Sequence, residues 1–403
     1  MKRLLVYSHD TYGLGNLRRM FAVCQYLSDA FSDLTILLLS GSPMVHSFRL
    51  PRRIDYIKLP CLTRTEREEY AVKSLGLGIG EAIRLRSDLM LSAAANFKPD
   101  LFLVDKKPYG VKNELEATLK YLKERHPETR HALLLRDILD APEATIKVWG
   151  RHGYYGVIQS FYDLVLVLGM PEIFDPRQEY QFPDAVAARV KFCGYTRPQP
   201  GQRDRDEVRR ELRLSDQDHL VLVTPGGGED GYALLATYLE ALASVSPGYR
   251  VRSLIVSGPE MIESQRQRLS QAAAAHSGVR VLEFTDDLMS YLGAADLVIS
   301  MGGYNTVCEI LSLQKRAIVV PRVRPVQEQW IRAERMGRWG LFKVIHPDHL
   351  TPERLARCLL DELDSTSDRT EIYSHLDLDA RPKIAHWIST LLFDAELETV
   401  RGA

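Results

Sequence analysis

Cysteine, net charge and long apolar runs are all scarce in this 403-residue sequence. Its five cysteines are scattered and form no C-x-x-C pair: Cys24, Cys61, Cys193, Cys308 and Cys358. This pattern argues against a disulfide framework and against a zinc site, and it is typical of a reducing compartment. The formal net charge is −1. Because the chain as a whole attracts neither nucleic acid nor anionic lipid, we expect no nucleic-acid partner.

No segment approaches the roughly 20 apolar residues that span a bilayer. Only a short apolar run separates Met1-Lys2-Arg3 from His9 and Asp10, so we expect no signal peptide and a cytoplasmic protein. The segment 48–53, FRLPRR, mixes basic and apolar residues. It leaves peripheral membrane contact possible, although a solvated loop is the simpler interpretation.

Short apolar runs alternate with helical patterns along most of the chain, which predicts α/β domains with parallel sheets. The expected strands are Leu4–Tyr7, Thr35–Leu39, Leu101–Val104, Ala132–Leu135, Leu164–Leu168, Leu220–Thr224, Arg252–Val256, Val279–Glu283, Leu297–Ser300 and Ala317–Val320. The expected helices include Asn16–Ala30, Gly80–Asn96, Glu114–Arg125, Glu143–Tyr162, Asp204–Leu214 and Pro382–Leu397.

A Pro-rich, non-periodic stretch at 193–200 predicts a linker between two domains. We expect an N-terminal Rossmann-like domain over residues 1–197 and a second over 198–380. Residues 381–403 are expected to form a helix that packs back on the first domain. Ligands of open α/β sheets bind beyond the carboxyl ends of the strands, which predicts a site in a cleft between the two sheets.

The segment 296–333 carries the strongest motif. A strand ends at Ser300, and Gly302, Gly303, Asn305 and Thr306 are expected to occupy the first turn of the next helix. The orphan N–H groups and the dipole of such a helix start favour a diphosphate.

Three further polar residues follow in the same segment. Glu309 lies one turn beyond the glycines, where its carboxylate can accept both hydroxyls of a ribose, although a solvated helix residue is the alternative. Glu328 and Gln329 follow the next strand and can satisfy several hydroxyls of one pyranose. Surface Glu-Gln pairs are common, and it is the position of this pair that gives it weight. Together these residues predict a nucleotide-sugar site.

Two glycine-rich loops follow strands elsewhere. The loop from Ser8 to Arg19 contains Gly13 and Gly15, but it is a weak dinucleotide fingerprint, and an unliganded turn is the alternative. Gly226, Gly227 and Gly228 follow a buried strand and can present backbone N–H groups to a phosphate. Three successive glycines are costly to order, which favours a binding loop over a simple turn.

These segments resemble the GT-B glycosyltransferases, and most of all the group around the N-acetylglucosamine transferase of peptidoglycan synthesis (MurG type). The resemblance is specific over 284–333 and weaker elsewhere. It implies two Rossmann-like domains whose parallel sheets face a central cleft. It also implies that the loop with Phe284 and Leu288 meets uracil, that Glu309 holds the ribose, and that Glu328 and Gln329 hold the donor sugar. By the same resemblance, Gly226–Gly228 lie near the diphosphate and the acceptor.

One position departs from the family pattern. The family's first loop reads G-x-G-H, and its histidine is the usual candidate base, but here Asn16 follows Gly15. A carboxamide cannot take a proton from an acceptor hydroxyl near neutral pH. The chain is then an inactivated variant, or it uses another base, with His9, Asp10 and Asp105 as candidates, or it binds a nucleotide sugar without transferring it. His9 could also be a structural histidine, and Asp105 could cap a turn.

The sequence thus predicts a transferase that moves a sugar from a UDP-sugar, UDP-N-acetylglucosamine-like, to an acceptor hydroxyl with inversion. We expect no metal and no cofactor besides the donor substrate, because helix starts take the place of a metal at the diphosphate. The acceptor, a small molecule, a glycan or a lipid-linked sugar, is left open, as is the oligomeric state. The alternatives are a nucleotide-sugar hydrolase and a non-catalytic nucleotide-sugar-binding protein.

Overall fold

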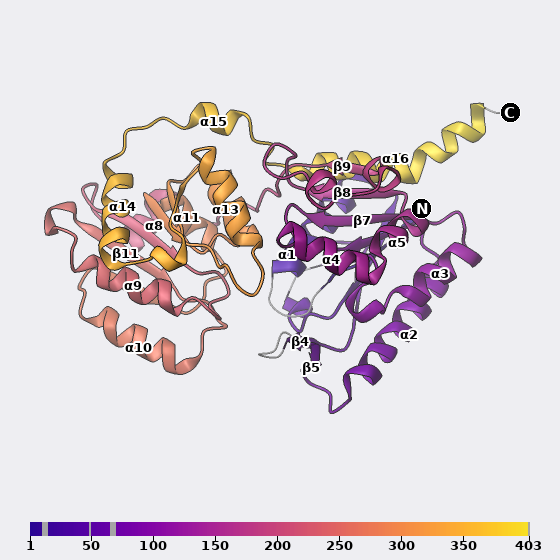
Figure 1. Cartoon of the computed structure of the whole chain (residues 1–403), viewed down its shortest axis with the longest axis horizontal. Coiled ribbons are helices and arrows are strands. Elements are labelled where there is room, and N and C mark those ends of the chain that lie inside the picture. Colours follow the sequence, from indigo (N-terminus) through magenta and orange to yellow (C-terminus); the bar gives the residue numbers. More distant parts are fainter. Residues whose placement is uncertain (10–14, 48–49, 65–69, 402–403) are drawn as a thin grey trace. The chain divides into compact units, whose positions relative to one another are not determined.

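The computed structural model describes residues 1–9, 15–47, 50–64 and 70–401 and divides into two compact units (Figure 1). The first unit comprises Met1–Tyr195 and Asp379–Ala403, and the second comprises Thr196–Leu378. These divisions fall two residues before the boundaries that the linker pattern predicts. No helix in the described part of the chain is long and apolar enough to cross a membrane.

The first unit is built on a seven-stranded parallel sheet with the order β3-β2-β1-β6-β7-β8-β9. The strands are β1 (Lys2–Tyr7), β2 (Leu34–Ser40), β3 (Ile54–Lys58), β6 (Leu101–Asp105), β7 (Arg130–Arg136), β8 (Leu164–Leu168) and β9 (Val190–Phe192). Strands β6 and β8 are buried at every residue, because parallel strands covered on both faces need apolar side chains throughout. A separate antiparallel pair, β4 (Leu62–Arg64) and β5 (Tyr70–Val72), lies outside this sheet.

Helices and short helical turns connect the strands of the first unit. They are α1 (Gly15–Ala30), η1 (Val45–Ser47), α2 (Ile79–Phe97), η2 (Val111–Asn113), α3 (Glu116–Arg125), α4 (Pro142–His152), α5 (Tyr154–Phe161), α6 (Pro176–Glu179), α7 (Asp184–Ala187) and α16 (Ala380–Arg401). The single helix expected over 143–162 is wrong, because Gly153 adopts φ 64° and ends α4 before α5 begins. Helix α16 returns to the first unit and packs on α1, with the rings of Phe31 and Phe393 5.8 Å apart (Figure 1).

The second unit is built on a six-stranded parallel sheet with the order β12-β11-β10-β13-β14-β15. Its strands are β10 (His219–Thr224), β11 (Val251–Val256), β12 (Val279–Leu282), β13 (Leu297–Ser300), β14 (Ala317–Val319) and β15 (Lys343–Val344). Its helices are α8 (Arg205–Glu211), α9 (Tyr232–Leu242), η3 (Pro247–Tyr249), α10 (Glu263–Ala274), α11 (Leu288–Ala294), α12 (Tyr304–Ser312), α13 (Glu328–Arg338), η4 (Pro347–His349), α14 (Pro352–Asp364) and α15 (Thr370–Ser374).

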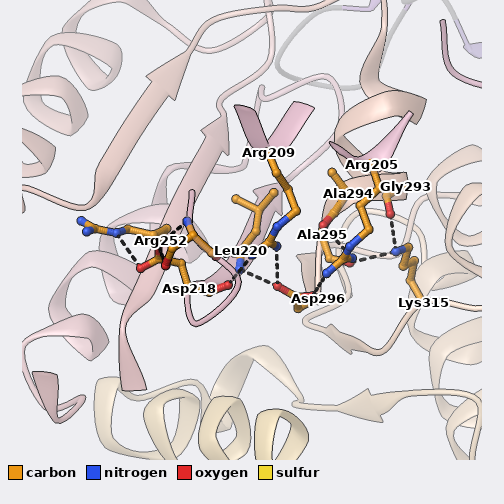
Figure 2. Close-up of polar contacts among 11 residues, drawn as sticks. Arg205, Arg209, Asp218, Leu220, Arg252, Gly293, Ala294, Ala295, Asp296 and Lys315 are labelled. Atoms are coloured by element: carbon orange, nitrogen blue, oxygen red, sulfur yellow. Dashed lines mark hydrogen bonds and ion pairs between the residues drawn. The ribbon is translucent and has the colours of Figure 1, made fainter. Parts of the chain in front are cut away.

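A network of charged side chains occupies the amino edge of this second sheet (Figure 2). Asp296, just before β13, accepts hydrogen bonds from the backbone N–H of Leu220 at 2.8 Å and from Arg205 at 2.7 Å. Lys315, just before β14, donates to two backbone carbonyls at the carboxyl end of α11, at 2.6 and 2.8 Å. These contacts fix where the strands begin. Because the strands are parallel, their carboxyl ends share the opposite edge, which leaves that edge for a ligand.

Candidate functional site

In the second unit, the candidate binding residues follow the carboxyl ends of three neighbouring strands. The glycines 226–228 follow β10, Gly302 and Gly303 follow β13, and Glu328 and Gln329 begin α13 after β14. The local sequence explains the pattern, since each apolar strand is followed by residues that end a strand or begin a helix. The sheet order β10-β13-β14 then places these segments along one edge.

The glycine loop after β10 is shaped mainly by packing. Gly228 has φ 100°, and a Cβ there would lie 2.3 Å from the carbonyl oxygen of Ser257. The carbonyl of Gly227 accepts a hydrogen bond from the N–H of Glu260 at 2.8 Å. At Gly226, with φ 92°, a Cβ would meet nothing within 4 Å. Gly228 thus has a packing reason, whereas a Cβ at Gly227 would meet only the side chain of Glu260, and there is open space at Gly226.

The turn between β13 and α12 requires glycine at 302. Gly302 has φ 70°, and a Cβ there would lie 2.6 Å from Cγ1 of Val319. Helix α12 begins at Tyr304 with Gly303 as its N-cap. The prediction that Gly302 and Gly303 lie within the first turn is therefore wrong, because both glycines precede it. Gly303 has no side chain to cap the first N–H groups of α12, which favours an anion at this helix start.

Three predicted ligand residues lie on α12. Asn305 and Glu309 are partly exposed and are four residues apart, so they share one face of the helix. Thr306 is only 9% exposed. Of the polar side chains on this helix that the sequence analysis named, Asn305 and Glu309 are therefore the more accessible to a ligand.

Glu328 and Gln329 are largely buried at the start of α13, with exposed fractions of 6% and 9%. The side-chain Oε1 of Gln329 accepts a hydrogen bond from the N–H of Arg322 at 3.0 Å. A Cβ at Gly303 would lie 3.9 Å from Nε2 of Gln329, so this amide reaches the start of α12. The structure therefore brings the starts of α12 and α13 together.

Arg332 joins these two helix starts, and the sequence analysis assigned it no role. The residue is fully buried. Its guanidinium lies 3.6 Å from Oε2 of Glu328 and 3.4 Å from the carbonyl oxygen of Gly302, and its Cζ lies 5.4 Å from the ring centroid of Tyr304. The four-residue spacing from Glu328 was the available signal. Arg332 thus connects the start of α12 with the start of α13, and Glu328 offsets its charge.

The loop between β12 and α11 presents the ring of Phe284, which is 47% exposed. Leu288 begins α11 and is partly buried. Asp287 anchors the loop by accepting three hydrogen bonds: from Ser290 Oγ at 2.7 Å, Gln202 N at 3.1 Å and Arg203 Nε at 3.0 Å. Burial by itself would raise the pKa of the Asp287 carboxyl. The hydrogen bonds from these donors have the larger effect, so the pKa is lowered. The exposed ring of Phe284 thus lies on a loop that the hydrogen bonds of Asp287 hold in place.

In the first unit, Asn16 ties together the ends of β1 and β6. Its Nδ2 donates to the carbonyl of His9 at 2.8 Å, and its Oδ1 accepts from Arg19 at 3.2 Å. Arg19 also pairs with Asp105 at 2.9 Å, and Asp105 accepts the backbone N–H of His9 at 3.3 Å. His9 and Asp105 are 0% and 1% exposed. Asp10, the third candidate base, lies outside the described residues. Gly15 begins α1, immediately before Asn16.

The hydrogen bonds of Tyr7 determine the tautomer of neutral His9. The phenol of Tyr7 donates its proton to Oε1 of Glu114 at 2.6 Å, and its oxygen accepts the N–H of Val111 at 3.3 Å. Nδ1 of His9 lies 3.4 Å from the same oxygen. Because the phenol proton is already committed to the carboxylate, Nδ1 must carry the hydrogen of this contact. Nε2 is then the basic nitrogen of His9.

Among the described residues, no three His, Cys, Asp or Glu side chains are grouped so as to hold a metal ion. The predicted site residues form two sets, because some lie in the first unit and the others in the second. The second unit unites the glycine loops with Glu309, Glu328 and Gln329, and the first unit unites His9, Asn16 and Asp105.

The second unit is similar to parts of known proteins. Residues 222–384 match the model of the glycosyltransferase family 28 C-terminal domain. An uncharacterised glycosyltransferase of Methanopyrus kandleri is 25% identical over 243 residues, which are 58% of this chain and 66% of that protein. The UDP-N-acetylglucosamine–N-acetylmuramyl-(pentapeptide) pyrophosphoryl-undecaprenol N-acetylglucosamine transferase of Haemophilus influenzae is 30% identical over 150 residues, 37% of this chain and 41% of that protein. The chain thus spans less than two thirds of the length of either relative.

The fold of the whole chain has known counterparts. The crystal structure of MurG from Acinetobacter baumannii superposes with a TM-score of 0.62, at 14% identity, over 97% of this chain and 100% of that one. At this identity the likeness concerns the fold, and it confirms the predicted architecture of two parallel α/β sheets. The chain has the GT-B fold, and its residues 222–384 are similar to the glycosyltransferase family 28 C-terminal domain.

Proposed function

We propose that this protein is a glycosyltransferase that binds a UDP-sugar through its second unit and transfers the sugar to an acceptor hydroxyl. The observation that carries the proposal is the junction of α12 and α13. There the start of α12 with its glycine N-cap, the partly exposed Glu309, and the buried Glu328, Gln329 and Arg332 lie together. A positive helix start beside sugar-binding groups is the chemistry that a nucleotide diphosphate sugar requires.

The diphosphate would lie against the first N–H groups of α12, with Gly226 leaving room beside it. Arg332, between Gly302 and Glu328, would hold the two helix starts in position for the diphosphate. These fixed groups would stabilise the negative charge that develops on the leaving UDP. Transfer by this route needs no metal.

The nucleoside and the sugar have distinct candidate partners. The carboxylate of Glu309 would accept the two ribose hydroxyls, and Phe284 would lie near the uracil. Because Oε1 of Gln329 is bound to the Arg322 N–H, its Nε2 is the group that would donate to a sugar hydroxyl. Glu328 would accept from another hydroxyl. The H. influenzae relative is named for UDP-N-acetylglucosamine, which supports a donor of that kind.

The first unit would supply the acceptor site and the base. In an inverting transfer the acceptor oxygen attacks the anomeric carbon as UDP leaves, and a base takes the hydroxyl proton. Asn16 cannot do so, and Asp105 is engaged by Arg19. Of the described candidates, His9 is the better base, because an imidazole takes a proton near neutral pH whereas Asp105 is held in an ion pair with Arg19.

A calorimetric titration of the purified protein with UDP, ADP and GDP tests the donor site. We expect UDP to bind most tightly and Glu309→Ala to weaken UDP about tenfold or more, because two charge-assisted hydrogen bonds are lost. Glu240→Ala is the matched control, since Glu240 is an exposed carboxylate on α9. Unchanged UDP affinity in Glu309→Ala would remove the ribose assignment and with it the proposed donor site.

A non-catalytic binding protein is the second candidate, and the engagement of Asn16 in a structural tie favours it. Incubation with UDP-N-acetylglucosamine separates the possibilities. Free sugar without an acceptor indicates a hydrolase, and sugar on an acceptor from a cell extract indicates a transferase. Loss of turnover in His9→Gln with UDP binding intact would support His9 as the base. If neither the native chain nor Asn16→His turns over any nucleotide sugar, the binding protein is the better description.

A further inference from the structure

A hollow of about 400 Å3 lies in the second unit beside β15, the last strand of the sheet. Trp330, Glu334 and Arg338 line it from α13, at four-residue spacing along one helix face. Lys343 and His346 line it from β15 and the turn that follows. The volume is within the usual range for small-ligand sites. None of the proposed donor-binding residues lines this hollow.

The hollow has an aromatic wall. The rings of Trp330 and His346 meet edge to face, with centroids 4.7 Å apart and an angle of 87° between their planes. Phe342, only 2% exposed, lies behind them. The N–H of Asp348 donates to Nδ1 of His346 at 3.2 Å, so Nε2 of neutral His346 carries a hydrogen and can donate it. This wall offers ring faces at right angles to each other and a hydrogen-bond donor.

The rim of the hollow is positively charged. Arg338 is paired with Glu334 at 2.7 Å, so these two charges offset each other. Lys343 and Arg354 also line the hollow and are exposed, and neither side chain is paired with a carboxylate among the residues that the structure describes. Two uncompensated cations beside an aromatic wall are complementary to a dianion that carries a ring.

We propose that this hollow binds a phosphate monoester attached to a planar ring. The ring would pack against Trp330 and His346, and the phosphate would meet Lys343 and Arg354. Aryl phosphates and nucleoside monophosphates share this chemistry. The site is separate from the donor site, so it gives the protein a second small-molecule ligand.

Trp330 provides a direct probe of this site. The four tryptophan indole N–H signals of the full-length protein are followed by heteronuclear NMR, and the Trp330 signal is assigned from its loss in Trp330→Phe. We expect phenyl phosphate to shift this signal with an affinity at least ~10-fold above that of inorganic phosphate or benzyl alcohol. Inorganic phosphate lacks the ring, and benzyl alcohol lacks the phosphate. Equal affinities for the three probes would overturn the proposal.

Charge variants locate the phosphate. Lys343→Gln and Arg354→Gln should each weaken phenyl phosphate by about fivefold, as expected for one exposed charged contact. Arg357→Gln should not, since Arg357 is exposed on the same α14 helix and does not line the hollow. Equal effects of all three substitutions would indicate a general charge effect and contradict the site.

Saturating UDP separates this proposal from the proposed donor site. The response of Trp330 to phenyl phosphate should persist with UDP present and in Glu309→Ala, and its loss in either case would show that the probe occupies the donor site instead. On UDP-saturated protein, AMP binding more tightly than phenyl phosphate would assign the hollow to nucleotides. Weaker AMP binding would assign it to smaller aryl phosphates. The result stands whether or not the protein transfers sugars.

Discussion

Glu114 and Arg86 form a buried ion pair beneath the first-unit site, and Glu114→Gln tests its contribution to stability. Both side chains are 0% exposed. The carboxylate accepts hydrogen bonds from Nε and Nη2 of Arg86 at 2.5 and 2.8 Å, and from Tyr7 at 2.6 Å. The substitution keeps the shape of the side chain but leaves the guanidinium buried without its counter-charge.

The expected loss follows from these contacts. Removing one partner of a buried pair costs about 3–5 kcal/mol. Because glutamine retains one acceptor oxygen and Arg86 keeps its bond to the carbonyl of Pro60 at 2.7 Å, we expect the lower end, near 3 kcal/mol. With a urea dependence of about 3 kcal/mol per molar, the midpoint of unfolding should fall by about 1 M.

Urea unfolding followed by tryptophan fluorescence measures this loss. Replacing Trp330 and Trp339 by Phe in all proteins confines the signal to Trp149 and Trp387, which both belong to the first unit. Glu116→Gln, whose carboxylate is exposed and paired only with a surface lysine, is the control.

The control should lose less than about 0.5 kcal/mol. A Glu114→Gln protein as stable as the control would refute the argument. The double variant Arg86→Met/Glu114→Leu should recover part of the loss, because neither charge then remains buried.

Two further substitutions probe the second unit. Gly302→Ala should cost about 2 kcal/mol or more of unfolding free energy, since an alanine at φ 70° is strained and its Cβ would contact Val319 at 2.6 Å. Gly303→Ala, with φ −57° and its nearest neighbour at 3.9 Å, should cost much less, and equal losses in urea unfolding would contradict this reasoning. Burial and, second, Arg205 lower the pKa of Lys315 from 10.5 to about 8. The unfolded chain therefore binds more protons between these values, so the unfolding free energy should rise by at most ~3 kcal/mol from pH 8 to 10.5. The rise should be missing in Lys315→Met, and parallel pH curves for the two proteins would show that Lys315 is not its source.

The strands and the turns after them were largely predictable from the sequence. Each expected strand occurs within a residue or two of its predicted bounds, because a run of apolar residues is a local property. The strands missed are short or at sheet edges, such as β3, β9 and β15, where fewer residues are buried and the apolar pattern is weak. The break at Gly153 was missed because one glycine within a helical pattern does not reveal its φ angle.

The roles of the site residues were only partly predictable. The sequence identified Glu309, Glu328 and Gln329 from their positions after strands. It did not show that Gln329 is buried and that its Oε1 accepts the Arg322 N–H, which leaves Nε2 as the group that could contact a ligand. The sequence also offered a phosphate role for all three glycines 226–228, whereas packing against the backbone after β11 is by itself a reason for glycine at 228.

The sequence by itself determined the α/β architecture, the glycines before α12 and the presence of a non-basic side chain at Asn16, because these depend on residue type and on neighbours along the chain. The tertiary structure alone decided that Arg332 bridges Gly302 and Glu328, that Asn16 ties His9 to Arg19, and that α13 presents a second, aromatic face beside β15. These contacts join residues that only the ordering of the strands and the packing of helices on them bring together.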